Sequence, residues 1–144
     1  METWVILVTD GMVIEYAPEA YETAERARDE ARRWAWILSG MRRLPIEESE
    51  TDRWSVGDRD VRLVRAEGTG TWVGTFWTWH GYPEPEAALL GGRSEARSWA
   101  VAPLHDSLEP SSVEENEWTI VATFEQRGEE AYAVAHKLKN VVAR

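Results

Sequence analysis

The stretch 71–82, which reads TWVGTFWTWHGY, constrains the fold most because it holds five of the fifteen aromatic residues of the chain. Side chains alternate sides along a strand, so Trp72 and Phe76 would face one side while Trp77 and Trp79 face the other. Neither face is polar, and such a strand is usually covered on both sides. Each buried aromatic side chain removes about 150–250 Å² from water. We therefore expect a central strand that feeds the core.

The same stretch also supports a functional interpretation, in which its C-terminal aromatic residues are partly exposed. Trp and Tyr are enriched at the energetic centres of protein interfaces, so Trp77, Trp79 and Tyr82 would then form a contact surface. His80 follows directly, and an apolar wall beside an imidazole can shift its pKa and place it next to a ligand. A capping or turn role for His80 is the alternative.

The length and composition favour a single domain without cysteine chemistry. A chain of 144 residues falls within the usual size of one domain, so we expect residues 1–144 to form one, with a loop-rich acidic insertion at about 83–116. No run of 18 apolar residues could span a membrane, and the start METWVILVTDG lacks a basic leader, which predicts a cytoplasmic protein. The absence of cysteine excludes disulfides, thiolate nucleophiles and iron–sulfur clusters.

The charge is strongly negative and uneven. The net charge of −10 disfavours direct binding to nucleic acid, whose nonspecific affinity comes from Lys and Arg neutralising phosphates. Residues 84–130 carry eleven acidic against three basic residues, whereas residues 131–144 carry three basic residues and no acidic one. The most acidic third of the chain therefore follows the aromatic stretch.

The N-terminal third predicts a hairpin and a helix. Two apolar runs, 3–9 and 12–16, flank Asp10-Gly11, a dipeptide that favours a tight hairpin turn. A helix is expected from Thr23, as N-cap, to Ser39, with Gly40 as a left-handed cap. Trp36 falls outside the apolar stripe of this helix, so it either packs beneath the following loop or makes an exposed contact.

The rest of the chain predicts a meander and a second helix. Residues 53–56 and 61–67 are expected to form strands that lead into the aromatic strand. Within the insertion, a helical turn is expected at 86–90 and a short strand at 98–102. A strand at 118–124 and a helix at 129–142 follow, and they resemble the opening strand and helix too briefly to establish a duplication. We predict an α+β fold with an antiparallel or mixed sheet of about five to six strands and two helices packed on one face.

Catalytic and metal-binding patterns are weak. His105, Asp106 and Glu109 could supply three metal ligands, but such short triples arise by chance, and the prolines around them favour a loop. No G-x-S-x-G nucleophile elbow is present, and Gly68 and Gly70 precede a strand rather than the helix that a dinucleotide fingerprint requires. We predict no cofactor and no metal.

The leading hypothesis is a small acidic, non-enzymatic binding protein, similar in action to inhibitors, immunity proteins or adaptors, that engages a basic protein partner. A second is a small-ligand binder or enzyme with a pocket lined by Trp and His. A third is a self-associating subunit, such as a homodimer that buries its aromatic residues. The candidate contact residues are Trp36, Trp77, Trp79, His80, Tyr82, Glu84 and Glu86.

Overall fold

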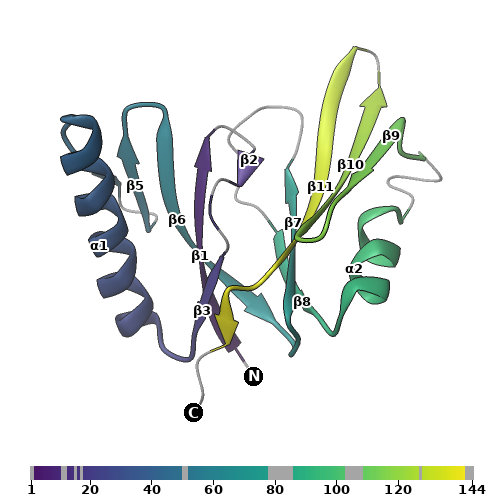
Figure 1. The fold of residues 1–144 in the computed structure, drawn as a ribbon, viewed down its shortest axis with the longest axis horizontal. Helices are drawn as coiled ribbons and strands as arrows, with labels where there is room; N and C mark the ends of the chain where they lie inside the picture. The colour runs from purple at the N-terminus through teal and green to yellow at the C-terminus, as the bar shows by residue number, and fades with distance from the viewer. Residues whose placement is uncertain are drawn as a thin grey trace. The chain divides into compact units, whose positions relative to one another are not determined.

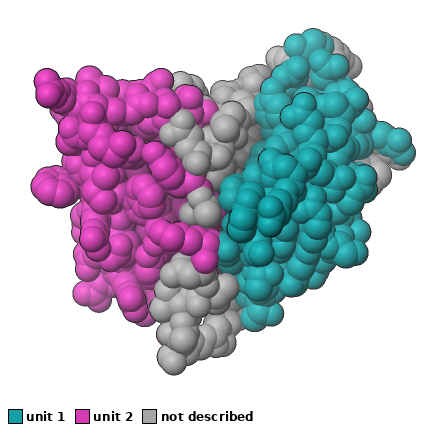
Figure 2. Space-filling model, viewed as in Figure 1, with its two compact units in different colours: residues 1, 66–138 teal, residues 2–65, 139–144 magenta. Residues whose placement is uncertain are grey.

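The computed structural model describes residues 2–10, 13–14, 16, 18–49, 52–77, 86–102, 109–126 and 128–141. These hold two helices and twelve strands, two of which have only two residues (Figure 1). The predicted α+β class with a mixed, mostly antiparallel sheet is confirmed, but the strands outnumber the five to six that were predicted. The chain divides into two compact units, unit 1 at Ala66–Leu138 and unit 2 at Glu2–Arg65 with Lys139–Arg144 (Figure 2).

Unit 2 arranges its strands in the order β12-β3-β1-β6-β5-β4, with β2 paired to β1. Their bounds are β1 (Glu2–Asp10), β2 (Val13–Ile14), β3 (Glu19–Tyr21), β4 (Glu47–Ser49), β5 (Arg53–Val56), β6 (Arg59–Glu67) and β12 (Asn140–Val141). The antiparallel pairs Thr9–Ile14 and Asp10–Val13 confirm the N-terminal hairpin. The antiparallel pairing of β5 with β6 is confirmed as well. The predicted continuation of this meander into the aromatic strand is wrong, because β6 and that strand are not neighbours in the sheet. The two-residue β12 adds in parallel beside β3.

Helix α1 (Ala24–Arg42) packs on the strands of unit 2. Thr23 is the N-cap as predicted, and its hydroxyl accepts a hydrogen bond from the Arg26 backbone N–H at 3.3 Å. The predicted cap at Gly40 is wrong, because the helix continues to Arg42 and Arg43 takes the left-handed conformation instead, with a φ of 56°. The helix buries its alanine stripe and Leu38 against the core, whose other members are Ile6, Val8, Tyr21, Trp54, Val56, Val61 and Leu63.

Unit 1 arranges its strands in the order β8-β7-β11-β10-β9. Its elements are β7 (Trp72–Trp77), β8 (Glu86–Leu90), α2 (Arg93–Ala100), β9 (Ser112–Glu115), β10 (Thr119–Gln126) and β11 (Glu129–Lys137). The aromatic strand β7 is central, as expected, with β8 on one side and β11 on the other. Trp72 is buried in the core and Phe76 packs against it. The end of β6 also belongs to this unit, where Glu67 pairs in parallel with Ala88.

Three secondary-structure predictions in unit 1 are wrong. Residues 129–137, within the predicted helix 129–142, form strand β11 instead. The sequence pattern did not identify the strand because it is buried on both faces. Ala131, Ala133 and Ala135 belong to the core beside α2, while Val134 and His136 are buried on the opposite face, so no polar alternation marks the strand. The expected helical turn at 86–90 is β8, and most of the expected strand at 98–102 lies in or directly after α2.

The two units repeat one topology. With the two-residue β2 left out, β1 lies between β3 and β6 in unit 2, as β7 lies between β8 and β11 in unit 1. A helix follows β3 and β8 in the chain, and a short parallel segment, β12 or the end of β6, lies beside each of these two strands. The sequence carries the same repeat: Thr3-Trp4-Val5 opens β1 as Thr71-Trp72-Val73 opens β7, and EARRWA at 30–35 in α1 matches EARSWA at 95–100 in α2. The first strand is thus repeated at β7, and not at the strand 118–124, whose brief resemblance to the opening strand was noted above.

Candidate functional site

Trp36 is the candidate contact residue that the structure describes most fully. Its side chain is 73% exposed on α1, as the contact interpretation requires. Its helical neighbours one turn earlier are Arg32 and Arg33, and Arg32 lies 3.5 Å from a Glu48 carboxylate oxygen and 3.8 Å from one of Asp29. The surroundings of Trp36 are therefore of mixed charge rather than acidic.

Trp36 begins an exposed apolar set on unit 2. The set continues through the last turns of α1 into the segment before β4, and its further members are Ile37, Met41, Leu44 and Ile46. Met41 is 70% exposed and the other three are 38% exposed. Apolar side chains gathered in this way mark a contact surface more often than isolated ones do.

The other candidate contact residues are not tested by the structure. Trp79, His80, Tyr82 and Glu84 lie outside the described residues, as do the side chains of Trp77 and Glu86 at the ends of β7 and β8. His105 and Asp106 of the weak metal triple also lie outside them. The pocket lined by Trp and His therefore stays a prediction.

A second exposed indole lies in unit 1, at Trp118, in the turn before β10. Its side chain is 50% exposed, and the Asn116 carboxamide oxygen holds the turn by accepting hydrogen bonds from the backbone N–H groups of Trp118 at 2.8 Å and Thr119 at 2.9 Å. The Lys137 ammonium lies 5.1 Å from the centre of the Trp118 ring, within the range of a cation–π contact.

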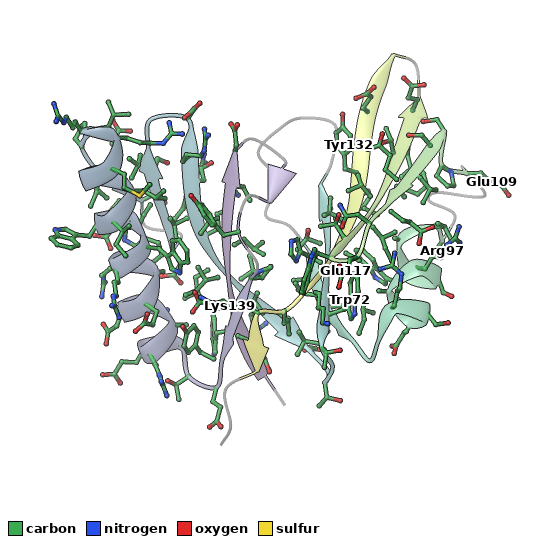
Figure 3. The ribbon with its side chains drawn as sticks, in the orientation of Figure 1. Trp72, Arg97, Glu109, Glu117, Tyr132 and Lys139 are labelled. Carbon is green, nitrogen blue, oxygen red and sulfur yellow. The ribbon has the colours of Figure 1, made fainter. Side chains whose placement is uncertain are left out.

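Four glutamates precede this indole along the chain, and we call Glu109, Glu114, Glu115, Glu117 and Trp118 the acidic edge. Residues 109–118 include no Lys or Arg. Within the acidic edge, Glu115 is held by α2, because Arg97, which Figure 3 labels, lies 3.0 Å and Arg93 lies 3.6 Å from its carboxylate oxygens.

Three carboxylates of the acidic edge are exposed and form no ion pair with any other described residue: those of Glu109, Glu114 and Glu117. Strand β9, which carries Glu114, pairs with β10 alone among the described strands, so its other edge is open. The acidic edge therefore presents negative charge, an indole and unpaired backbone groups together.

A pocket opens in unit 2, beside α1 and β3, with a volume of about 270 Å³. Its lining combines acidic, basic and apolar side chains: Glu19, Glu30, Arg33, Trp34, Ile37 and Lys139. Tyr16 stacks on Trp34 with ring centres 5.1 Å apart and the planes tilted by 41°. The sequence did not single out any of these residues.

Glu19 organises one wall of this pocket. One carboxylate oxygen accepts a hydrogen bond from Trp34 Nε1 at 2.9 Å and lies 3.8 Å from Nζ of Lys139, the residue that Figure 3 labels beside β12. The other oxygen accepts a hydrogen bond from the Tyr21 hydroxyl. Burial raises the pKa of Tyr21 well above its ordinary value, and the hydrogen bond to Glu19 raises it further. Glu19 therefore fixes the indole and the ammonium in place.

His136 is the one histidine among the described residues, and it is 7% exposed on β11. Its Nδ1 atom lies 2.8 Å from the Lys137 carbonyl oxygen and can donate a hydrogen bond to it. Burial lowers the pKa of His136 and favours the neutral imidazole. Its cross-strand neighbour is Val73, so its surroundings are those of a core residue.

The described part of the chain offers no group of three or more His, Asp or Glu side chains that could hold a metal ion. Neither of its helices combines the length and apolarity needed to cross a membrane.

One signal in the sequence could have located the pocket. When the two repeats are aligned in sequence, Trp34 of α1 corresponds to Trp99 of α2, and Ile6 of β1 corresponds to Gly74 of β7. A Cβ atom at Gly74 would lie 2.7 Å from the Trp99 ring, so that indole rests directly on its strand. The isoleucine in unit 2 fills the corresponding space, and Trp34 is hydrogen-bonded to Glu19 instead.

Compared with known proteins, the chain matches no family model, no curated protein and no solved structure.

Proposed function

We propose that this chain is a small acidic, non-enzymatic binding protein, acting as an inhibitor, immunity protein or adaptor, whose acidic edge engages a basic protein partner. The observation that carries the proposal is the half-exposed Trp118 within a stretch of four glutamates and no basic residue. The cysteine-free sequence fits the reducing cytoplasm, where we place this activity.

Trp118 supplies the apolar anchor of the proposed contact. Tryptophan is enriched among interface residues whose truncation costs about 2 kcal/mol or more. The Lys137 ammonium over its ring shows that the indole accepts a cation at this position. Lysine and arginine side chains of a partner would use the same attraction.

Glu114 and Glu117 supply uncompensated charge. Opposite charges on two partners accelerate their association, and salt screens this attraction over a distance of about 8–10 Å at physiological ionic strength. The net charge of −10 adds long-range attraction for a basic protein and repels nucleic acid. The proposal therefore requires binding that weakens as the salt concentration rises.

The test compares two charge-matched double variants of the full chain. Glu114→Gln with Glu117→Gln changes the acidic edge, whereas Glu25→Gln with Glu47→Gln removes the same charge from exposed positions of unit 2. Partners are recovered by pulldown at low salt, and the affinity of each purified partner is measured for the wild type, both doubles and Trp118→Ala.

We expect the edge double and Trp118→Ala to weaken binding at least tenfold, and the unit 2 double to leave it nearly unchanged. Equal losses for the two doubles would show that only net charge matters. Retention that does not fall between low and high salt would contradict the proposal as a whole.

Self-association is a second candidate, favoured by the exposed apolar set on α1. Trp36 and Met41 of α1 are each at least 70% exposed, an unusual exposure for large apolar side chains, and Met41 shares a helix face with Ile37, four residues earlier. A symmetric dimer would bury them. Sedimentation velocity at two protein concentrations tests for such a dimer. A dimer formed through α1 should be lost in Trp36→Glu, and a wild type that stays monomeric at both concentrations would refute self-association.

A further inference from the structure

The pocket of unit 2 carries charges of both signs beside a smaller apolar part. Two carboxylates, Glu19 and Glu30, and two cations, Arg33 and Lys139, line it together with Trp34 and Ile37. All of the lining residues belong to unit 2. This site is therefore separate from the acidic edge of unit 1, and its function does not depend on that of the edge.

Part of this charge is already engaged. Glu19 accepts hydrogen bonds at both oxygens, from Trp34 Nε1 and from the Tyr21 hydroxyl. Lys139 lies 3.8 Å from Glu19, and its side chain is still 62% exposed, so its ammonium has further N–H donors to offer. Glu19 thus orients the pocket, and Lys139 stays open to a ligand.

The other charged pair is open. Glu30 and Arg33 lie three residues apart on α1, a spacing at which opposite charges can pair. Neither forms an ion pair or a side-chain hydrogen bond with any described residue. A carboxylate and a guanidinium that line one pocket without neutralising each other are available to groups from outside.

The volume sets the size of a ligand. The pocket, at about 270 Å³, is just below the range of about 300–1,000 Å³ that is typical of drug-sized ligands. The lining is mostly polar, and Trp34 and Ile37 add a smaller apolar part that suits a short aliphatic or aromatic body. The acidic and basic lining groups are mixed, because Glu19 and Lys139 lie 3.8 Å apart and Glu30 and Arg33 are three residues apart on α1. A ligand whose two charged groups are close together therefore fits this lining.

We propose that this pocket binds a small zwitterion of the free amino-acid class, with its ammonium at Glu30, its carboxylate at Arg33 and Lys139, and its apolar side chain on Trp34 and Ile37. A simple anion would be repelled by Glu30 and by the net charge of −10. A simple cation would leave Arg33 without a counter-charge, because only Lys139 of the two is paired among the described residues, with Glu19. A zwitterion satisfies both pairs at once.

The experiment titrates the full ¹⁵N-labelled chain with L-leucine and L-phenylalanine at up to millimolar concentrations and follows the indole N–H signals. The Trp34 signal is assigned from its loss in Trp34→Phe. N-acetyl-L-phenylalanine, which lacks the ammonium, and L-phenylalaninamide, which lacks the carboxylate, serve as matched analogues. Glu30→Gln and Arg33→Gln each remove one open charge, and Glu25→Gln removes an exposed carboxylate of the same helix outside the pocket.

We expect a saturable shift of the Trp34 signal with at least one amino acid, and at least tenfold weaker binding of both analogues. Glu30→Gln and Arg33→Gln should each weaken binding of the amino acid at least fivefold, while Glu25→Gln should not. The inference is overturned if neither amino acid shifts Trp34 saturably, if the analogues bind as tightly as the amino acid, or if Glu25→Gln weakens binding as much as Glu30→Gln.

Discussion

Replacing Gly74 with alanine tests the packing of α2 on β7. An ideal Cβ atom at Gly74 would lie 2.7 Å from two atoms of the Trp99 ring and 2.9 Å from a third. Carbon atoms in favourable contact are about 3.5–4.0 Å apart, so the indole or the strand must move by close to 1 Å. The core of unit 1 leaves little room for such a movement, because Ala96 and Ala100 of α2 are fully buried beside it.

The expected net cost follows from two opposing effects. Overpacking a core costs about 1–3 kcal/mol. Alanine also reduces the freedom of the unfolded chain, which contributes about 0.4–1 kcal/mol in the opposite direction. We therefore expect Gly74→Ala to lower the free energy of unfolding by about 0.5–2 kcal/mol, measured as a shift of the urea midpoint.

A control of opposite sign is available at Gly40. This glycine lies inside α1, and nothing lies within 4 Å of the position of its missing Cβ atom. Gly40→Ala should therefore raise the free energy of unfolding by about 0.5–1 kcal/mol through helix propensity. The double variant Gly74→Ala with Trp99→Leu should lose less than the two single variants together. The packing argument is refuted if Gly74→Ala is as stable as the wild type, or if the two changes are additive.

Three further predictions concern α1 and two titratable groups. Thr23→Ala removes the N-cap that accepts from Arg26 and should cost about 1 kcal/mol in urea unfolding; an unchanged midpoint would contradict it. His136 has a lowered pKa in the folded state, so the unfolded chain binds a proton at a higher pH than the folded chain does. The stability that the neutral imidazole contributes should therefore be lost as the pH falls below about 6.5. In thermal unfolding, His136→Gln should lack this pH-dependent loss of stability. Tyr21 should stay protonated above a pH of about 10, the ordinary pKa of a tyrosine, and an absorbance titration in which Glu19→Gln does not lower its pKa would refute the role of that carboxylate.

Local signals in the sequence located much of the fold. The helix at α1 and the strands β1, β5, β6 and β7 were predictable because turns, caps and apolar stripes are set by residues near one another in the chain. Strand β11 was not, because Ala131, Val134 and Ala135 also match the spacing of a helical stripe, and burial on both faces removes the alternation that would identify a strand. The repeat EARRWA and EARSWA would have predicted α2 by comparison with α1.

The candidate site was predictable only in part. The place of Trp36 outside the apolar stripe of α1 left two alternatives, packing beneath the following loop or exposure, and only the structure decides for exposure. The pocket does not follow from any local pattern, because Glu19, Trp34 and Lys139 come from three distant parts of the chain and meet only after folding.

The sequence by itself determined the elements with strong local signals, the repeat and the acidic balance of this protein. The tertiary structure alone decided which indoles are accessible. Trp54 in RWSV and Trp118 in EWTI have similar sequence surroundings, yet one is 2% and the other 50% exposed. The physical reason is which helix packs over each indole. Trp54 belongs to the core on which the 19-residue α1 packs, whereas the 8-residue α2 packs on a core that does not include Trp118.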